Sequence, residues 1–161
     1  MLNSADDTFF SLLQKDQTAI VAFRGGKISQ AEWLKASLEI SKDFLGILGK
    51  IGFPYKDAST EDEYRAAITL LLHLDLSGMR EVFNTYIDKQ SSGRIVPEHW
   101  AMCVDKIRVI SGRPQLYGTQ YKIDKNKKID LLPLENAGEV DEIRNKAGLQ
   151  PLKQYLDSIA S

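Results

Sequence analysis

Three groups of side chains in this sequence could carry chemistry, and they fall in two stretches of the chain. His73 ends an apolar run, and a histidine can act near neutral pH as a general base or a ligand contact. Asp105 and Arg108 stand three residues apart, which places them on adjoining faces of one helical turn. The third group is the segment 112–120, with the sequence GRPQLYGTQ, which follows them directly.

The segment 112–120 is unusually dense in hydrogen-bonding side chains. Four of the six positions from 115 to 120 carry an amide, a phenol or a hydroxyl, namely Gln115, Tyr117, Thr119 and Gln120. A ligand site needs a few placed polar groups of this kind, so the segment could contact a small polar molecule. The alternative is a loop that bonds to itself and seats the following segment on a helical framework.

The other candidates also have structural interpretations. His73 lies in a helix that we expect to be buried, where Thr69 or a carboxylate could satisfy its imidazole. An ion pair between Asp105 and Arg108 could pin the loop that follows, because an unpaired buried charge is costly. Cys103, the one cysteine, is expected to be a small core residue and has no partner for a disulfide within the chain.

Composition and motif content argue against several classes of protein. With 21 basic and 22 acidic residues the chain lacks the positive field that binding to nucleic acid requires. No stretch is long and apolar enough for a membrane span, and the N-terminus does not resemble a signal peptide, so we expect a cytoplasmic protein. Phosphate-loop, HExxH, CxxC and GxSxG motifs are absent, and two histidines and one cysteine make a zinc site improbable. We predict no metal and no cofactor.

Hydrophobic spacing predicts a mainly α protein: a helical bundle with one small C-terminal β-hairpin and short terminal helices. Capping boxes at Ser29–Glu32 and Thr60–Glu63 mark two helix starts. The helix that begins after Thr60 should be buried because it is apolar on nearly every side. Residues 121–123 and 129–131 alternate as hairpin strands do. We expect one domain over 1–161, with N-terminal helices in 1–55, central helices in 60–112, the polar loop and hairpin in 113–135, and C-terminal helices in 138–160.

The helix end 105–108 and the following GRPQLYGTQ segment resemble the signature of an uncharacterised bacterial family, a domain of unknown function with a Q-x-Y-G-T-Q motif. The similarity covers roughly residues 60–156 and includes His73 and Asp75. The family brings no established activity. The resemblance implies that His73, Asp105, Arg108 and the 115–120 loop belong to one pattern.

Two functional hypotheses follow. In the first, a pocket under the 115–120 loop binds a small polar ligand or performs metal-free catalysis; the catalytic candidates are His73 and Asp105, and the ligand-binding candidates are Arg108, Gln115, Tyr117, Thr119 and Gln120. In the second, the chain is a non-catalytic interaction domain, such as an inhibitor, immunity or adaptor protein, with a protein partner on an exposed face. Neither hypothesis involves nucleic acid or a membrane.

Overall fold

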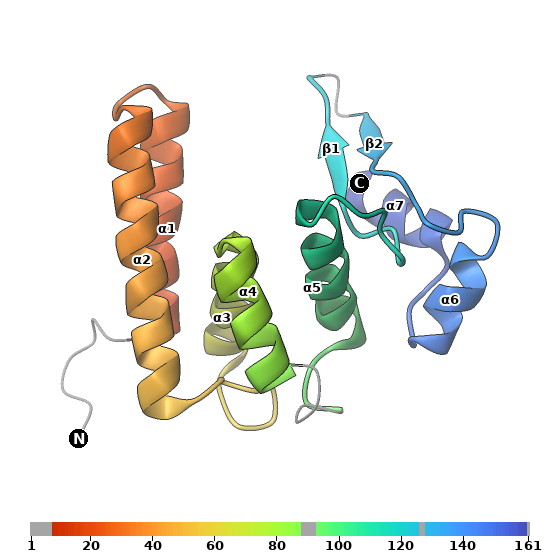
Figure 1. Cartoon of the computed structure of the whole chain (residues 1–161), viewed down its shortest axis with the longest axis horizontal. Coiled ribbons are helices and arrows are strands. Elements are labelled where there is room, and N and C mark those ends of the chain that lie inside the picture. The colour runs from red at the N-terminus through yellow and green to blue at the C-terminus, as the bar shows by residue number, and fades with distance from the viewer. Residues whose placement is uncertain (1–7, 88–92, 126–127, 161) are drawn as a thin grey trace. The chain divides into compact units, whose positions relative to one another are not determined.

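The computed structural model describes residues 8–87, 93–125 and 128–160 and is mainly helical (Figure 1). It also contains a two-stranded antiparallel hairpin near the C-terminus. The mainly α fold with one small hairpin, expected from the sequence, is confirmed. In chain order the elements are α1 (Phe9–Arg24), α2 (Gln30–Ile51), α3 (Glu61–His73), α4 (Leu76–Val82), the π-helix η1 (Phe83–Ile87), α5 (Pro97–Ile110), β1 (Tyr121–Ile123), β2 (Ile129–Leu131), α6 (Val140–Lys146) and α7 (Leu152–Ala160).

The chain divides into two compact units, Met1–Gly78 and Met79–Ser161, and the boundary falls within α4. The segment 60–112, which the sequence groups as central helices, is therefore shared between the two units. Residues on each side of the boundary contact mainly their own unit, so each unit has a set of contacts that can be understood separately. The organisation of the chain as one domain stays a prediction.

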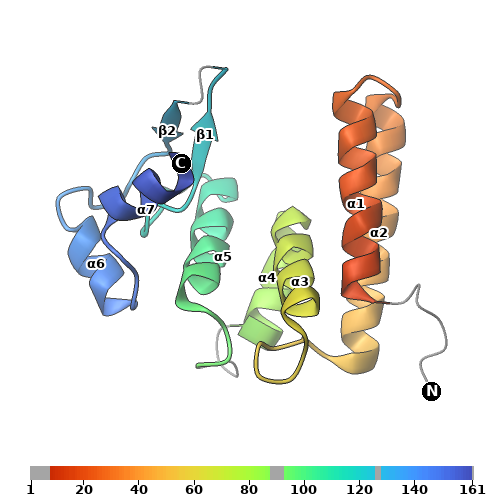
Figure 2. The ribbon, with the colours of Figure 1, turned by 180° about the vertical axis from the view of Figure 1, so that it is seen from behind.

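In the first unit α1 and α2 form an antiparallel pair, and they lie side by side in both Figure 1 and Figure 2. Aromatic contacts join the two helices at both ends. Phe9 meets Phe44 edge-on with ring centroids 5.7 Å apart, and Phe23 stacks on Trp33 at 5.0 Å. Such pairs contribute about 0.5–1.5 kcal/mol each beyond the burial of their surface.

The capping boxes predicted from sequence define where α2 and α3 begin. Ser29 and Glu32 form the full reciprocal box, and Thr60 accepts a hydrogen bond from the Glu63 amide. Glu63 has a different role from the one a capping box would give it, because its carboxylate accepts the backbone amides of Phe9 (2.9 Å) and Phe10 (3.2 Å) at the start of α1. Helix α3 is thereby fastened to α1.

The prediction that α3 is a buried helix is confirmed. It packs on α1, and its buried side chains extend around much of its surface: Tyr64, Ala66, Ala67, Ile68, Leu70 and Leu71. His73, its last residue, departs from this pattern because 39% of its side chain is exposed. The expectation that His73 lies in buried surroundings is corrected: the helix ends there, and only the preceding turns face the core.

The second unit is built around α5. Pro97 stands at its first turn, where a missing N–H costs nothing, and Gly112 follows its end with a φ of 75°, a value that glycine adopts without strain. The chain then runs through the 112–120 loop into the hairpin, whose register pairs Tyr121 with Leu131 and Ile123 with Ile129. Helices α6 and α7 complete this unit.

Among the helices in the described part of the chain, none combines the length and apolar character needed to cross a lipid bilayer.

Candidate functional site

The Asp105 carboxylate is completely buried and organises the loop that follows α5. One oxygen accepts the backbone amide of Leu116 at 2.7 Å, and the amide of Tyr117 lies 3.1 and 3.2 Å from the two oxygens. The second oxygen also accepts the backbone amide and the hydroxyl of Thr119, at 3.0 and 2.9 Å. Hydrogen bonds to a charged acceptor contribute more than neutral ones, so this carboxylate holds the loop backbone firmly.

Gln115 has the same kind of role as Asp105, but it acts through its side-chain amide. It is fully buried, and its Nε2 donates to the carbonyls of Gln120 (2.9 Å) and Leu132 (2.7 Å). Its Oε1 accepts the amide of Gln120 at 2.8 Å. Its backbone bonds to Pro133 and Glu135, so this one residue ties both flanks of the hairpin together.

Arg144, from α6, holds the loop through a different set of atoms. It is 1% exposed; its Nη1 donates to the carbonyl of Tyr117 and its Nε donates to the carbonyl of Gln150 at 2.7 Å. Burial lowers the pKa of this guanidinium from its ordinary value, and the ring of Tyr155 lies 4.9 Å from its central carbon. The loop is thus held by a carboxylate that accepts three of its backbone amides and by a guanidinium that donates to one of its carbonyls.

The remaining polar side chains of the loop are directed into this network. Thr119 donates to Asp105, and Gln120 donates to Thr119 at 3.3 Å and to the Met102 carbonyl at 3.5 Å. The Tyr117 ring packs against Trp100 with centroids 5.5 Å apart, and burial, followed by the Asp105 charge, raises the pKa of its phenol. This geometry corresponds to a loop that bonds to itself, which the sequence allowed as the alternative to a ligand-binding loop. Ligand binding by Gln115, Tyr117, Thr119 and Gln120, and catalysis by Asp105, stay predictions.

Arg108 is held at the edge of the same loop, where it bonds to different atoms from those that Asp105 contacts. Its Nε donates to the carbonyl of Pro114 at 2.7 Å, and its Nη2 forms an ion pair with Glu135. Asp105 and Arg108 therefore both fasten the loop, each with its own partners. The Arg108 side chain is 15% exposed, and it lines a pocket in the second unit.

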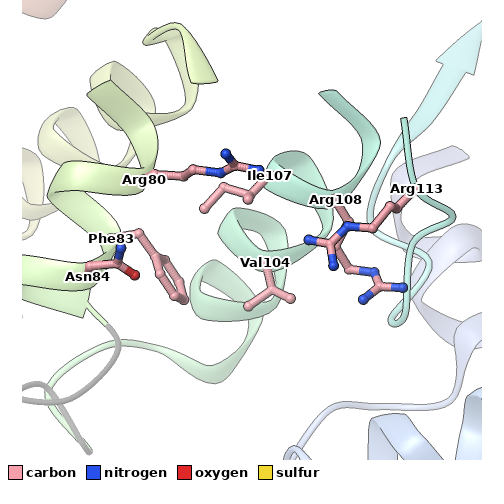
Figure 3. A pocket seen from close by; sticks show the side chains of 7 residues that line it. All are labelled: Arg80, Phe83, Asn84, Val104, Ile107, Arg108 and Arg113. Carbon is pink, nitrogen blue, oxygen red and sulfur yellow. The ribbon is translucent and has the colours of Figure 1, made fainter. Parts of the chain in front are cut away.

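That pocket, called the arginine pocket below, has a volume of about 270 Å³ and is rich in positive charge. Its seven lining residues include three arginines and one asparagine over an apolar surface: Arg80, Phe83, Asn84, Val104, Ile107, Arg108 and Arg113. Figure 3 shows the side chains from α4 and η1 on one side, and those from α5 and the loop on the other. Arg80 also donates to the Ser111 hydroxyl at 2.9 Å, which fixes the guanidinium near the end of α5.

His73 lies in the first unit, where it forms a pair with a carboxylate from α1. Its Nδ1 is 2.8 Å from an oxygen of Asp16, which is only 5% exposed, and Gln17 donates to the same oxygen at 3.1 Å. A carboxylate at Nδ1 fixes the ring orientation and leaves Nε2 as the group available for other contacts. Because His73 and the 115–120 loop belong to different units, their convergence in one site stays a prediction.

A second hollow, of about 170 Å³, lies between α1 and α2 in the first unit. Three lysines line it together with Asp43: Lys15, Lys42 and Lys50. Lysine ammonium groups are flexible point charges, and the carboxylate beside them offsets part of their field. The hollow is therefore less suited to an anion than the arginine pocket.

Metal and thiol chemistry find little support in the part of the chain that is described. Across residues 8–87, 93–125 and 128–160, histidine, cysteine and carboxylate side chains do not gather in groups of three that could hold a metal ion. Cys103 is fully buried, and burial raises the pKa of its thiol to about 12. A thiol of this kind is inert at neutral pH, which agrees with the core role expected from sequence.

Sequence reasoning missed most of the residues that line the arginine pocket. It selected Arg108 but not Arg80, Asn84 or Arg113, since a basic or amide side chain near the surface is common and carries no signal alone. It also gave no role to Asp16 or Arg144. Each of these side chains is buried, and an ionisable group in a helix flanked by core residues is the signal that could have identified them.

Comparison of the chain with protein-family models, with curated proteins and with solved structures found no significant match to any of them.

Proposed function

We propose that the second unit binds a small anionic molecule in the pocket lined by Arg80, Arg108 and Arg113. The observation that supports this proposal is the composition of the lining: three guanidinium groups and one amide, with no carboxylate among the seven residues. No reaction is assigned to this site, and the proposal is for binding alone.

The electrostatics of the lining favour an anion. Like charges held close together repel one another, and a bound anion removes that repulsion while gaining attraction to each guanidinium. Arginine presents its N–H groups in a planar fork that matches the oxygens of a carboxylate or a phosphate. Arg80 and Arg108 are already oriented by bonds to Ser111, Pro114 and Glu135, which reduces the entropy lost when a ligand binds.

The remaining lining residues indicate that the ligand also has an apolar part. Phe83, Val104 and Ile107 present a ring and two branched aliphatic chains to the same space. A bare inorganic anion would leave this surface in contact with water, whereas an anion that carries a ring or a short hydrocarbon group would cover it. The expected ligand is therefore amphipathic.

This proposal retains one part of the first sequence hypothesis, the assignment of Arg108 to an anionic group. In it residues 113 and 114 contribute the Arg113 side chain to the pocket and the Pro114 carbonyl that fixes Arg108, and the 115–120 loop that follows them is not the surface that contacts the ligand. Binding in the arginine pocket does not require His73 or Asp105 to act as catalysts.

Isothermal titration calorimetry on the full chain tests the proposal with phenyl phosphate, benzoate and the neutral compound benzyl alcohol. We expect the two anions to bind and the alcohol not to bind. Each of Arg113→Gln and Arg80→Gln should weaken anion binding at least about tenfold, since a hydrogen bond to a charged group contributes about 1.5–3 kcal/mol.

The matched control is Arg65→Gln, which removes an exposed arginine from α3 in the other unit. It should leave the affinity unchanged. Failure of both anions to bind at millimolar concentration, or equal affinity in Arg113→Gln and wild type, would overturn the proposal.

The alternative, a protein-interaction role, is favoured by a different observation. Val21, Leu34 and Leu38 are 66%, 47% and 64% exposed in the first unit, and a partner protein could cover such side chains. A chain that binds neither anion in the calorimetric titration would direct attention to these helices.

A further inference from the structure

The pair between Arg108 and Glu135 sets the net charge that a ligand meets in the arginine pocket. Glu135 follows the hairpin, its side chain is 45% exposed, and it bonds to Nη2 of Arg108. A guanidinium has five N–H donors. Because Pro114 and Glu135 take one donor each, three remain on Arg108 for other partners.

The charges of these four side chains can be counted directly. Three guanidinium groups line the pocket and one carboxylate neutralises one of them, so the group keeps a net charge of +2. We infer that the acid group of the ligand is a dianion, and that it belongs to a phosphate monoester. This inference rests on the proposed function of the pocket and names the ligand class that the same site would take.

A phosphate monoester fits the donors as well as the charge. Near pH 7 it carries a charge of about −1.5 to −2 and presents three strong acceptor oxygens, one for each arginine. A carboxylate offers one negative charge and two oxygens, so it would leave one guanidinium without a partner and a residual charge of +1. The Asn84 amide adds a neutral donor for the bridging ester oxygen.

The pocket has room for an ester group of several heavy atoms. Its volume of about 270 Å³ is many times the roughly 10–15 Å³ that a cavity needs in order to hold one water molecule. A phosphate with one six-membered ring can therefore be accommodated, and the ring would lie on Phe83, Val104 and Ile107.

A matched pair of probes separates the effect of the ligand's charge from the effect of its shape. Phenyl phosphate and phenyl sulfate have the same tetrahedral outline, but at pH 8 the first is a dianion and the second a monoanion. Coulombic attraction scales with the charge of the ligand. We expect phenyl phosphate to bind the full chain at least about tenfold more tightly than phenyl sulfate by calorimetry.

The Glu135→Gln variant tests the role of Glu135 in the same titrations. Its amide oxygen can still accept from Arg108, but the negative charge is gone. If the Glu135 charge lies about 8 Å from the charge of the ligand in a water-like dielectric, its removal should raise the affinity for the monoanion about two- to threefold. The dianion carries twice the charge, so its affinity should rise by the square of that factor, about four- to ninefold. The matched control is Glu139→Gln, which changes an exposed carboxylate before α6 and should alter neither affinity.

Equal affinity for phenyl phosphate and phenyl sulfate would overturn the inference, and so would equal gains for the two probes in Glu135→Gln. Either result would still leave anion binding intact, with both affinities reduced by Arg113→Gln. If phenyl phosphate, phenyl sulfate and benzoate all fail to bind, the proposed function fails with the inference, so the two failures are distinguishable.

Discussion

Substitution of Asp105 by asparagine probes the feature that holds the second unit together. The variant keeps the size of the side chain but replaces one carboxylate oxygen with an NH2 group. The oxygen facing Leu116 and Tyr117 can still accept, whereas the NH2 group would face the amide of Thr119, so two donors would oppose each other. One buried N–H then loses its acceptor at a cost of about 1–3 kcal/mol, and the remaining bonds lose their charge assistance. We expect a total loss of about 3–5 kcal/mol in the free energy of unfolding.

Tryptophan fluorescence during urea unfolding measures this loss in the second unit. The chain has two tryptophans, Trp33 in the first unit and Trp100 in the second, so the Trp33→Phe background reports on the second unit through Trp100. Trp100 is well placed because its ring contacts Tyr117. Asp130→Asn, at an exposed position in β2, is the control and should change stability by less than about 0.5 kcal/mol. An Asp105→Asn variant as stable as the Asp130→Asn control would refute the assigned role of Asp105.

Three further predictions concern the same loop and its helix. Gly118→Ala should destabilise the second unit by about 1–3 kcal/mol in urea, since φ is 73° and the new Cβ would lie 2.7 Å from Leu152 Cδ1; Gly138→Ala meets no atom within 4 Å and is its control. Gln115→Leu should cost about 2–4 kcal/mol in the same assay because it leaves two carbonyls and one amide without their bonds, and a cost below about 1 kcal/mol would contradict the role assigned to Gln115. The Cys103 thiol, with its pKa raised to about 12 by burial, should not react with Ellman's reagent at pH 8 until urea unfolds the chain; rapid reaction of the native protein would show that the thiol is accessible.

The fold was largely predictable because local rules determine where its helices begin and how their faces are used. The spacing of Ser29 and Glu32 matches a capping box, and the structure forms that box. Helix α3 is apolar on nearly every side after its first turn, which predicts burial, and six of its 13 side chains are buried. Gly46 and Gly49 weaken the helical pattern, yet α2 continues through both to Ile51, because packing contacts outweigh a propensity cost of about 1 kcal/mol per glycine.

The loop at 115–120 illustrates what a sequence pattern leaves undecided. Its density of polar side chains is apparent from the residues alone, but the direction of each side chain depends on partners elsewhere. Asp105 lies only eleven to fourteen positions away, whereas Arg144 is 27 positions from the Tyr117 carbonyl that it contacts. Whether such a loop faces a ligand or the interior is therefore decided by tertiary packing.

The arginine pocket could not be assembled from sequence for a related reason. Arg80 and Arg113 lie 33 positions apart, in α4 and in the 112–120 loop, and no sequence pattern links the two. The pair between Asp16 and His73 spans 57 positions and joins α1 to α3. Contacts of this kind follow from how helices pack, and hydrophobic periodicity reports only which face of a helix is buried.

Anion binding by the arginine pocket is tested most directly by NMR of the full chain with nitrogen-15 labels, titrated with phenyl phosphate. We expect the Nε–H signals of Arg80, Arg108 and Arg113 to shift, together with backbone amides in η1 and at the end of α5. Signals near Lys15 and Lys42 should stay in place. Shifts confined to those lysines, or no shifts at millimolar phenyl phosphate, would contradict it.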